Sequence, residues 1–490
     1  MRKKLALLLV YLLFPVTKTD AIINNQHVKK SKYDRHTVYK RLSLHEAILL
    51  ALRYNPDVKN AEIQRVADKF ALKLAKNNFE FQYALTASLA QTDNQIAAQQ
   101  NSSLTTTLTP TVHRTGVLGT TYSMSLNNPI INGIYHPGID LKLTQPLMRG
   151  FGKKVATASL YSATQSEKIN QLNLRSALIQ AVVAVITAYR QFVIDQNNIV
   201  IDKLSLKDYA QTIKLNNALI KAGRQAPTEV IQTKAEYTQM QFTLKNDKNI
   251  VKQDRLNLLR VIGLPAQTKI IVPKNIKINK RQQADINKIL AISLKNNITY
   301  LSQAIQLTLD KRQFLVDKDA ARTQLNLTLE AEKYGVVDTN STVEYEHKIY
   351  NDEKHFSALV NLNIPIDNYT LKQAIINDKV ILNQDAIKLA TLARNLKLTL
   401  IADTDTIETS YDAIKIAKTT LKLQRENQKY LQAKLKYGLV STFEVTTKQQ
   451  QLDQARVQLL QQKIAYLNAQ TQLYSDMGTI LNQWHIKVRY

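Results

Sequence analysis

This chain of 490 residues contains no cysteine, a single tryptophan, and only 11 glycines and 10 prolines. The absence of cysteine excludes disulfide scaffolds, thiolate metal sites, cysteine nucleophiles and a lipidated N-terminal cysteine anchor. The scarcity of glycine and proline permits long uninterrupted helices. Beyond the N-terminus no run reaches the roughly 18 consecutive apolar residues of a membrane helix. The best run, from Ala181 to Tyr189, stops at Arg190.

Catalytic motifs are also missing from the sequence. It has no nucleophile elbow, P-loop or Rossmann glycine pattern, and its 8 histidines are scattered without ligand spacing. Asp403 and Asp405 form only a lone spaced pair, for which a helix surface is the simpler interpretation. We therefore expect no enzyme activity, no cofactor and no metal site.

The charge balance is strongly basic, with a formal net charge of +27. Such a balance invites a nucleic-acid partner. Lysine and arginine are however spread along the sequence without runs, and aromatic stacking motifs are absent, so we expect no nucleic acid. A solvated basic surface, or contact with anionic lipid or cell-wall polymer, is the alternative account of the charge.

The first 21 residues have the three parts of a secretory signal peptide. Arg2, Lys3 and Lys4 precede an apolar run from Leu5 to Phe14, and Thr19-Asp20-Ala21 gives a small-x-small end. The apolar run is too short to span a bilayer, although an uncleaved anchor is the alternative. Residues 22–42 are polar and unpatterned, which predicts a flexible N-terminal segment. An exported chain without a membrane helix is either soluble outside the cytoplasm or spans the membrane as a β-barrel.

A repeat organises the rest of the sequence, since the segments Leu219–Gly263 and Lys434–Gly478 follow one plan. In each, a glycine opens a turn, a Glu-Val pair follows six residues later, and a long polar helix runs to a second glycine 40 positions after the first. The matching pairs are Gly223 with Gly438, Glu229 with Glu444, and Gly263 with Gly478. The regions before them also match, at an offset of 242 that relates Asn55 to Asn297.

An internal duplication fixes the unit of architecture. We predict two helix-strand-helix repeats at 43–265 and 284–482, a linker at 266–283 and a C-terminal tail at 483–490. Ser43 and Glu46 have the spacing of a capping box at the first helix, and Pro56 predicts a break after Asn55.

Four segments alternate apolar and polar residues with the period of a β-strand. They begin near Phe79, Ile139, Leu325 and Leu359. The polar insert between Thr92 and Pro137 could hold an extra hairpin around Leu104 to Leu126 or be an exposed loop. Four strands cannot close a membrane barrel, which needs roughly eight or more, so several chains must contribute to one barrel.

Two heptad-spaced stripes run along the last long helix. One contains Leu452, Ala455, Leu459, Tyr466 and Leu473, and the other contains Val457, Leu460, Ile464 and Leu467. A helix with two stripes contacts neighbours on both sides, as in the wall of a helical tube. An ordinary antiparallel bundle is the alternative.

Taken in order along the chain, these motifs resemble the outer-membrane efflux protein family, the TolC-like channels. The resemblance rests on three features: Leu42-Ser-Leu44-His-Glu-Ala47 leading to Asn55-Pro56, the segment Gln145-Pro-Leu-Met-Arg-Gly-Phe-Gly152, and the duplicated glycine turn. The resemblance covers Leu42 to about Leu481. It implies a mainly α fold with membrane β-structure, in which a homotrimer forms an α-helical barrel continued by a β-barrel with four strands from each chain.

The same resemblance implies a passive exit duct for efflux or type I secretion. The duct would sit in the outer membrane of a Gram-negative bacterium, in contact with its lipid, with the helices in the periplasm. Its partners would be a periplasmic adaptor protein and an inner-membrane transporter. A periplasmic coiled-coil adaptor or scaffold is the alternative function.

Site residues follow from the positions that match the family. The adaptor-contact tips would be Gly223, Arg224, Gln225, Gly438, Leu439 and Val440. Glu229 and Glu444 would form carboxylate rings at a pore constriction that favours cations, or else serve as first-turn residues stabilised by the helix dipole. Some members add an acidic residue one turn on, where Gln232 and Thr447 stand here. Bends between strand and helix are expected at Pro146, Gly150, Gly152 and Pro365.

Overall fold

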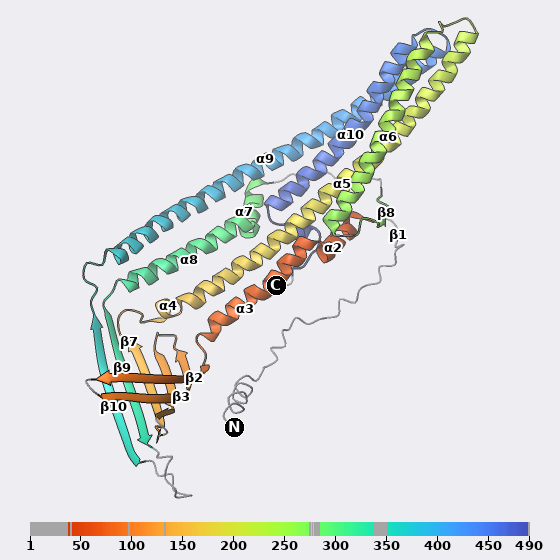
Figure 1. Cartoon of the computed structure of the whole chain (residues 1–490). Helices are drawn as coiled ribbons and strands as arrows, with labels where there is room; N and C mark the ends of the chain where they lie inside the picture. The colour runs from red at the N-terminus through yellow and green to blue at the C-terminus, as the bar shows by residue number, and fades with distance from the viewer. Residues whose placement is uncertain are drawn as a thin grey trace, which may run out of the picture.

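The computed structural model describes residues 38–39, 42–96, 99–131, 134–273, 276, 278, 285–336 and 350–488. The predicted signal peptide and most of the segment 22–42 lie outside the described residues, as do parts of the linker at 266–283. The chain is elongated, with a β-sheet at one end and long helices that run from it to two hairpin tips at the other end (Figure 1).

The first half contains helices α2 (Leu44–Tyr54), α3 (Pro56–Asn77), α4 (Lys153–Ala156), α5 (Ala158–Lys221) and α6 (Glu229–Ile262). The capping box predicted at Ser43 and Glu46 is confirmed, because each side chain accepts from the other residue's backbone N–H. Pro56 opens α3, where its missing N–H is not needed by the helix. The predicted break after Asn55 is therefore confirmed.

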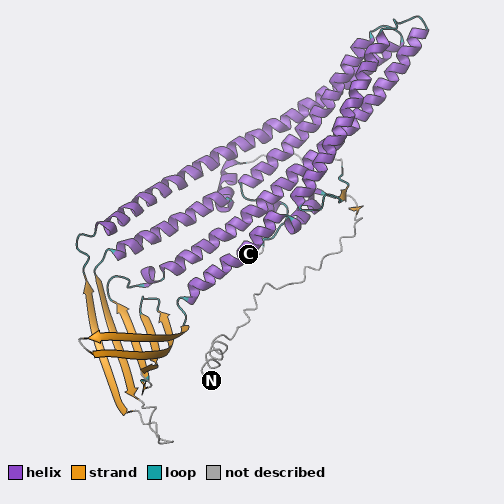
Figure 2. Ribbon diagram, viewed as in Figure 1, coloured by secondary structure: helices purple, strands orange, loops and turns teal. Residues whose placement is uncertain are grey.

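The second half contains α7 (Ile286–Asn296), α8 (Ile298–Ala320), α9 (Tyr369–Lys436), α10 (Thr442–Asp476) and α11 (Ile480–Gln483). Helices α5 and α9 have 64 and 68 residues, which at 1.5 Å per residue makes each about 100 Å long. Within the chain α10 contacts α9, α5 and α6, so its two apolar stripes have neighbours on more than one side. Figure 2 shows these helices running side by side.

The two halves make the same contact where their long helices end. Gly263 ends α6 against the Asn55 break, and the Asn55 amide donates to the Val261 carbonyl at 2.7 Å. In the second half Gly478 lies against Asn296, and the Asn297 amide donates to the Asp476 carbonyl at 2.8 Å. This junction therefore ties the short helices of each half to its last long helix.

The sheet has eight strands in the order β10-β9-β7-β4-β3-β5-β6, with β2 paired to β3. Their bounds are β2 (Gln82–Ile96), β3 (Gln99–Thr115), β4 (Thr121–Asn127), β5 (Pro129–Ile131), β6 (Ile134–Tyr135), β7 (Gly138–Pro146), β9 (Gln324–Val336) and β10 (Tyr350–Asn363). All pairings are antiparallel. The β2–β3 hairpin crosses the other strands at a steep angle (Figure 1).

The described sheet contains more strands than the four segments predicted from the alternation. The four predicted segments correspond to β2, β7, β9 and β10, while β3, β4, β5 and β6 come from the polar insert. Threonine and serine dominate β3, so its apolar alternation is weak in sequence even though threonine favours strands. The extra hairpin considered around Leu104 to Leu126 is present as β3 and β4.

The main hydrophobic core lies where α2, α5 and α6 meet. Ile48, Val185, Ile186 and Leu258 are completely buried there. The linker joins this core, because Ile270 of β8 (Lys269–Ile270) is buried and β8 pairs in parallel with β1 (Val38–Tyr39). Of the described helices α5 alone has an 18-residue window apolar enough to cross a membrane, but 67% of that window is buried in the chain. Burial makes it a core segment.

Candidate functional site

The predicted tip residues lie at the ends of two helical hairpins, α5–α6 and α9–α10. At the first tip the N–H of Arg224 donates to the Leu219 carbonyl at 2.9 Å, and at the second the N–H of Leu439 donates to the Lys434 carbonyl at 3.2 Å. These bonds close a Schellman-type C-cap around a left-handed residue. Gly223 and Gly438 fill that position, with φ of +70° and +72°.

The space around the tip glycines is open. A Cβ added at Gly223 would meet no atom within 4 Å, and at Gly438 it would meet only the Arg224 carbonyl oxygen, at 3.7 Å. The backbone conformation therefore requires glycine here, whereas packing within the chain does not. Leu439 and Arg224 are exposed beside the glycines, and Gln225 and Val440 are half-buried.

A polar latch joins the two tips. The Gln225 amide donates to the Thr442 hydroxyl at 2.8 Å, and the Thr442 backbone N–H donates to the Glu229 carboxylate at 3.0 Å. Beneath them the Asn216 amide donates to the Thr233 hydroxyl at 3.1 Å. Thr442, Asn216 and Thr233 are completely buried, so the latch is an internal connection between α5, α6 and α10.

The two candidate constriction glutamates are not equivalent. Glu229 is half-buried, and its carboxylate satisfies a backbone N–H at the start of α10, which is a helix N-capping role. Glu444 is exposed in the first turn of α10, and its side chain has no hydrogen bond or ion pair with any described residue. The Glu444 side chain is therefore exposed to solvent, while the Glu229 carboxylate connects the two tips.

Sequence reasoning missed the buried half of this site. Asn216, Thr233 and Thr442 were not singled out, although each is a polar residue on the packed face of its helix. It also missed the exposed aromatic rings beside the second tip, Tyr437 and Phe443, which are 73% and 59% exposed. Aromatic residues at a solvent-facing helix end are the sequence signal that could have identified them.

At the opposite end of the molecule the sheet has one apolar and one polar face. On β7, Leu141 and Leu143 alternate with Asp140 and Lys142. The register aligns Leu143 with Leu329, and Leu141 with Ala331 and then Phe356, so the alternation continues across β9 and β10. No described residue covers the apolar face, since Tyr83 of β2 and Phe356 are 77% and 76% exposed.

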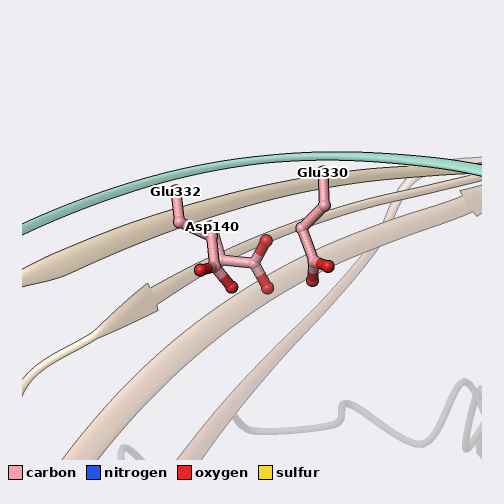
Figure 3. Close-up of side chains that lie close together, drawn as sticks. All are labelled: Asp140, Glu330 and Glu332. Carbon is pink, nitrogen blue, oxygen red and sulfur yellow. The ribbon is translucent and has the colours of Figure 1, made fainter. Parts of the chain in front are cut away.

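The polar face carries an acidic cluster. The carboxylate oxygens of Asp140, Glu330 and Glu332 lie within 4.8 Å of one another, and the three side chains project together from β7 and β9 (Figure 3). Lys142 partly compensates this charge, with its Nζ 3.3 Å from Glu330. This face is suited to water, and the opposite face is suited to an apolar medium.

The predicted bend residues lie between strand and helix. Pro146 is the last residue of β7, and Pro365 lies between β10 and α9. Gly150 and Gly152 have φ of +82° and +103°. The Gly150 N–H donates to the Asp319 carboxylate at 2.6 Å, which fixes the turn against the end of α8.

Comparison with known proteins shows the fold. No family model matches the sequence, and no curated protein matches it. Solved structures do match. One is CusC, whose study concerns transmembrane channel formation, with a TM-score of 0.68 and 14% identity over 89% of this chain and 92% of that one. A second is the Campylobacter jejuni CmeC outer membrane channel, with a TM-score of 0.66 and 14% identity over 89% of this chain and 86% of that one.

A third is the Neisseria gonorrhoeae MtrE outer membrane channel in its open state, with a TM-score of 0.67 and 14% identity over 89% of each chain. At this low sequence identity the comparisons show similarity of fold. The similarity of fold extends over nearly the whole chain. The predicted combination of long helices with a strand region is confirmed.

Proposed function

We propose that this chain, which has the fold of TolC-like outer-membrane channels, is the exit duct of a tripartite efflux or type I secretion system. It would conduct substrates passively from an inner-membrane transporter and a periplasmic adaptor to the exterior. The observation that carries the proposal is a two-faced sheet with unpaired edges at one end of helices about 100 Å long. No catalytic step is needed for this function.

The sheet supports a location in the outer membrane of a Gram-negative bacterium. Its continuous apolar face suits contact with lipid, and its polar face suits a water-filled lumen. The outer edges of β10 and β2 carry backbone groups that no strand of the described chain pairs. Unpaired edges are not tolerated in lipid, so neighbouring chains must complete the barrel. The homotrimer implied by the family resemblance meets this requirement.

The helices support a periplasmic tube made by the same trimer. Matching contacts at Gly263 with Asn55 and at Gly478 with Asn297 support the proposed duplication, in which each half supplies equivalent wall helices. Each chain then has two tips, and a trimer has six. A ring of alternating equivalent tips gives the narrow end of the tube a regular docking surface.

The open space at Gly223 and Gly438 supports adaptor docking at the tips. Partner helices can approach the backbone closely there, with Arg224, Gln225, Leu439 and Val440 around the contact. Glu444 is the better candidate for a carboxylate ring in the pore, because its side chain is exposed and unpaired among the described residues. Glu229 would act mainly by holding the tips together.

Planar bilayers test the proposal directly. Purified protein should form trimers in detergent and give stepwise conductance, and no conductance should appear with protein unfolded beforehand. A monomeric, non-conducting species extracted without detergent would refute the duct. Release from the outer membrane by salt or alkali would instead favour the periplasmic adaptor or scaffold.

A further inference from the structure

Four long helices each carry two aspartates seven residues apart. They are Asp195 and Asp202 in α5, Asp247 and Asp254 in α6, Asp310 and Asp317 in α8, and Asp378 and Asp385 in α9. A spacing of seven places both aspartates of one helix on the same face. Helix α5 packs against α6 and α8 packs against α9, so these faces can meet.

The aspartates meet as carboxyl pairs across both helix pairs. Beyond the effect of burial, Asp247 interacts with Asp202 and raises its pKa, and Asp195 does the same to Asp254. Beyond burial, Asp385 raises the pKa of Asp310, and Asp317 raises that of Asp378, in the same way. In two antiparallel helices, moving seven residues forward along one helix corresponds to moving seven residues back along the other. Each helix pair therefore carries two successive aspartate pairs. Asp403 of α9 and Asp476 of α10 form a fifth pair.

Each pair contains one buried carboxyl oxygen to which the other aspartate, if ionised, can donate no hydrogen bond. The Oδ2 atoms of Asp202, Asp254, Asp310, Asp378 and Asp403 are buried and have no hydrogen-bond partner. Asp202 is 7% exposed and lines a cavity of about 240 Å³ that it shares with Ser205 and Asp453. Ionised carboxylates only accept hydrogen bonds. One proton between the two members of a pair supplies the missing donor.

In several pairs the other aspartate accepts a hydrogen bond from a glutamine side chain. Gln191 donates to Asp195 at 2.7 Å, Gln313 to Asp317 at 3.0 Å and Gln472 to Asp476 at 3.0 Å. Amide donors stabilise the charged form of these carboxylates. The proton is therefore expected on the partner, which is Asp254, Asp378 or Asp403.

No lysine or arginine of the described residues forms an ion pair with the aspartates of these five pairs. Among the described groups that act on Asp202, Asp254, Asp310, Asp378 and Asp403, all the charged ones are aspartates. From α10, Asp453 faces Asp202, and Arg456 is engaged with Asp453 at 2.8 Å. Asp208 is the remaining carboxylate beside that arginine. The chain has 66 lysines and arginines, yet these aspartates face other aspartates. A shared proton would remove the repulsion between the two carboxylates of each pair.

We propose that each of these five carboxyl pairs holds one shared proton. These protons hold the helix pairs of the duct together at acidic to neutral pH, and the helix pairs separate more readily at higher pH. The inference concerns the wall of the helical part and does not depend on what passes through it.

The titration supports the direction of the effect. Burial, and then the neighbouring aspartates, raise the pKa of Asp202 to about 7, and burial with Asp195 raises that of Asp254 to about 7. Burial and Asp385 raise the pKa of Asp310 to about 6. A pKa raised by folding gives stability that is fully present below the unfolded value near 4 and is lost as pH rises through the folded value.

The size of the effect follows from the same linkage. A folded pKa of about 7 against an unfolded value of 3.8 changes the local opening constant by about a hundredfold between pH 5 and pH 8 for one independent pair. Segments around Asp202 and Asp254 should therefore exchange amide hydrogens faster at pH 8, after correction for intrinsic exchange rates.

Infrared spectroscopy and hydrogen exchange of the full-length protein in detergent test the proposal together. The C=O band of protonated carboxyls should be present at pH 6 and largely lost by about pH 8. Asp254→Asn and Asp378→Asn place a permanent donor in the pair, so each should weaken this band and flatten the pH dependence of exchange near its own aspartate pair. Asp405→Asn, at an exposed position of α9, is the matched control and should change neither.

Two results would overturn the proposal. The first is a wild-type infrared spectrum without a protonated-carboxyl band at pH 6, a measurement that remains available if a variant does not fold. The second is protection at pH 8 that appears with Mg²⁺ or Ca²⁺ and is lost with EDTA, which would assign the pairs to divalent cations.

Discussion

Replacing the duplicated glycines with alanine separates backbone strain from steric contact. Gly223, Gly263 and Gly478 all have left-handed backbone, with φ of +70°, +86° and +70°. Alanine in this conformation costs roughly 1–2 kcal/mol. The surroundings differ, because a Cβ at Gly223 meets open space, whereas at Gly263 or Gly478 it collides with the carbonyl oxygen of Tyr54 or Asn296.

The two terms give distinct expected losses of stability. Gly223→Ala should cost only the roughly 1–2 kcal/mol of backbone strain. Gly263→Ala and Gly478→Ala should add about 1–3 kcal/mol, because backbone must move to admit the new atom. The junction variants should therefore lose about 2–5 kcal/mol in all. Gly438→Ala is a second control, since its φ is +72° and its Cβ would meet only the Arg224 carbonyl oxygen, at 3.7 Å.

Denaturant unfolding followed by circular dichroism of the helices would measure these losses in purified, detergent-solubilised protein. The predicted order places both junction variants below both controls. Equal losses at Gly223 and Gly263 would show that the close approach to Tyr54 does not matter. A junction variant as stable as wild type would refute the contact itself.

Three further predictions concern the tips and the buried charges. Gly438→Leu should leave unfolding close to that of Gly438→Ala but weaken adaptor binding measured by co-purification, whereas loss of folded protein would contradict the open tip. Glu444→Gln should lower cation selectivity in planar bilayers more than Glu229→Gln, and equal effects would contradict the latch role of Glu229. Arg65→Met should cost about 3–5 kcal/mol, because it leaves the Glu167 carboxylate buried and unpaired. Adding Glu167→Met should recover most of that loss in thermal melts, and no recovery would show that the pair is not coupled.

Local signals in the sequence located the helices well. Ser43 with Glu46, the Asn55-Pro56 break and the four glycines of the repeat all mark helix ends in the structure. These features depend on a few neighbouring residues and on backbone conformation, which is why they can be read without tertiary information. The double stripe on α10 also belongs to this class, because helical periodicity alone reveals it.

Features that depend on pairing across the chain could not be read in the same way. Strand β3 is rich in threonine and serine, and its partners β2 and β4 had to be known before its place in the sheet was evident. The linker strand β8 has only two residues and is defined by its pairing with β1. The aspartate repeats are visible in the sequence, but only the helix register shows that they face one another.

The buried polar contacts follow from the packing of long helices that are exposed to water on more than one side. A helix that meets water on two sides cannot be apolar all round, so its seams are narrow and an apolar seam alone leaves the helices free to shift by a heptad. Polar pairs remove that freedom because the two side chains can hydrogen-bond at only one relative position of the helices. Gln428 and Gln449 are 3% and 2% exposed and hydrogen-bonded at 2.9 Å between α9 and α10. With the Asn216 and Thr442 contacts near the tips and the aspartate pairs nearer the sheet, such contacts set the register along the length of the long helices.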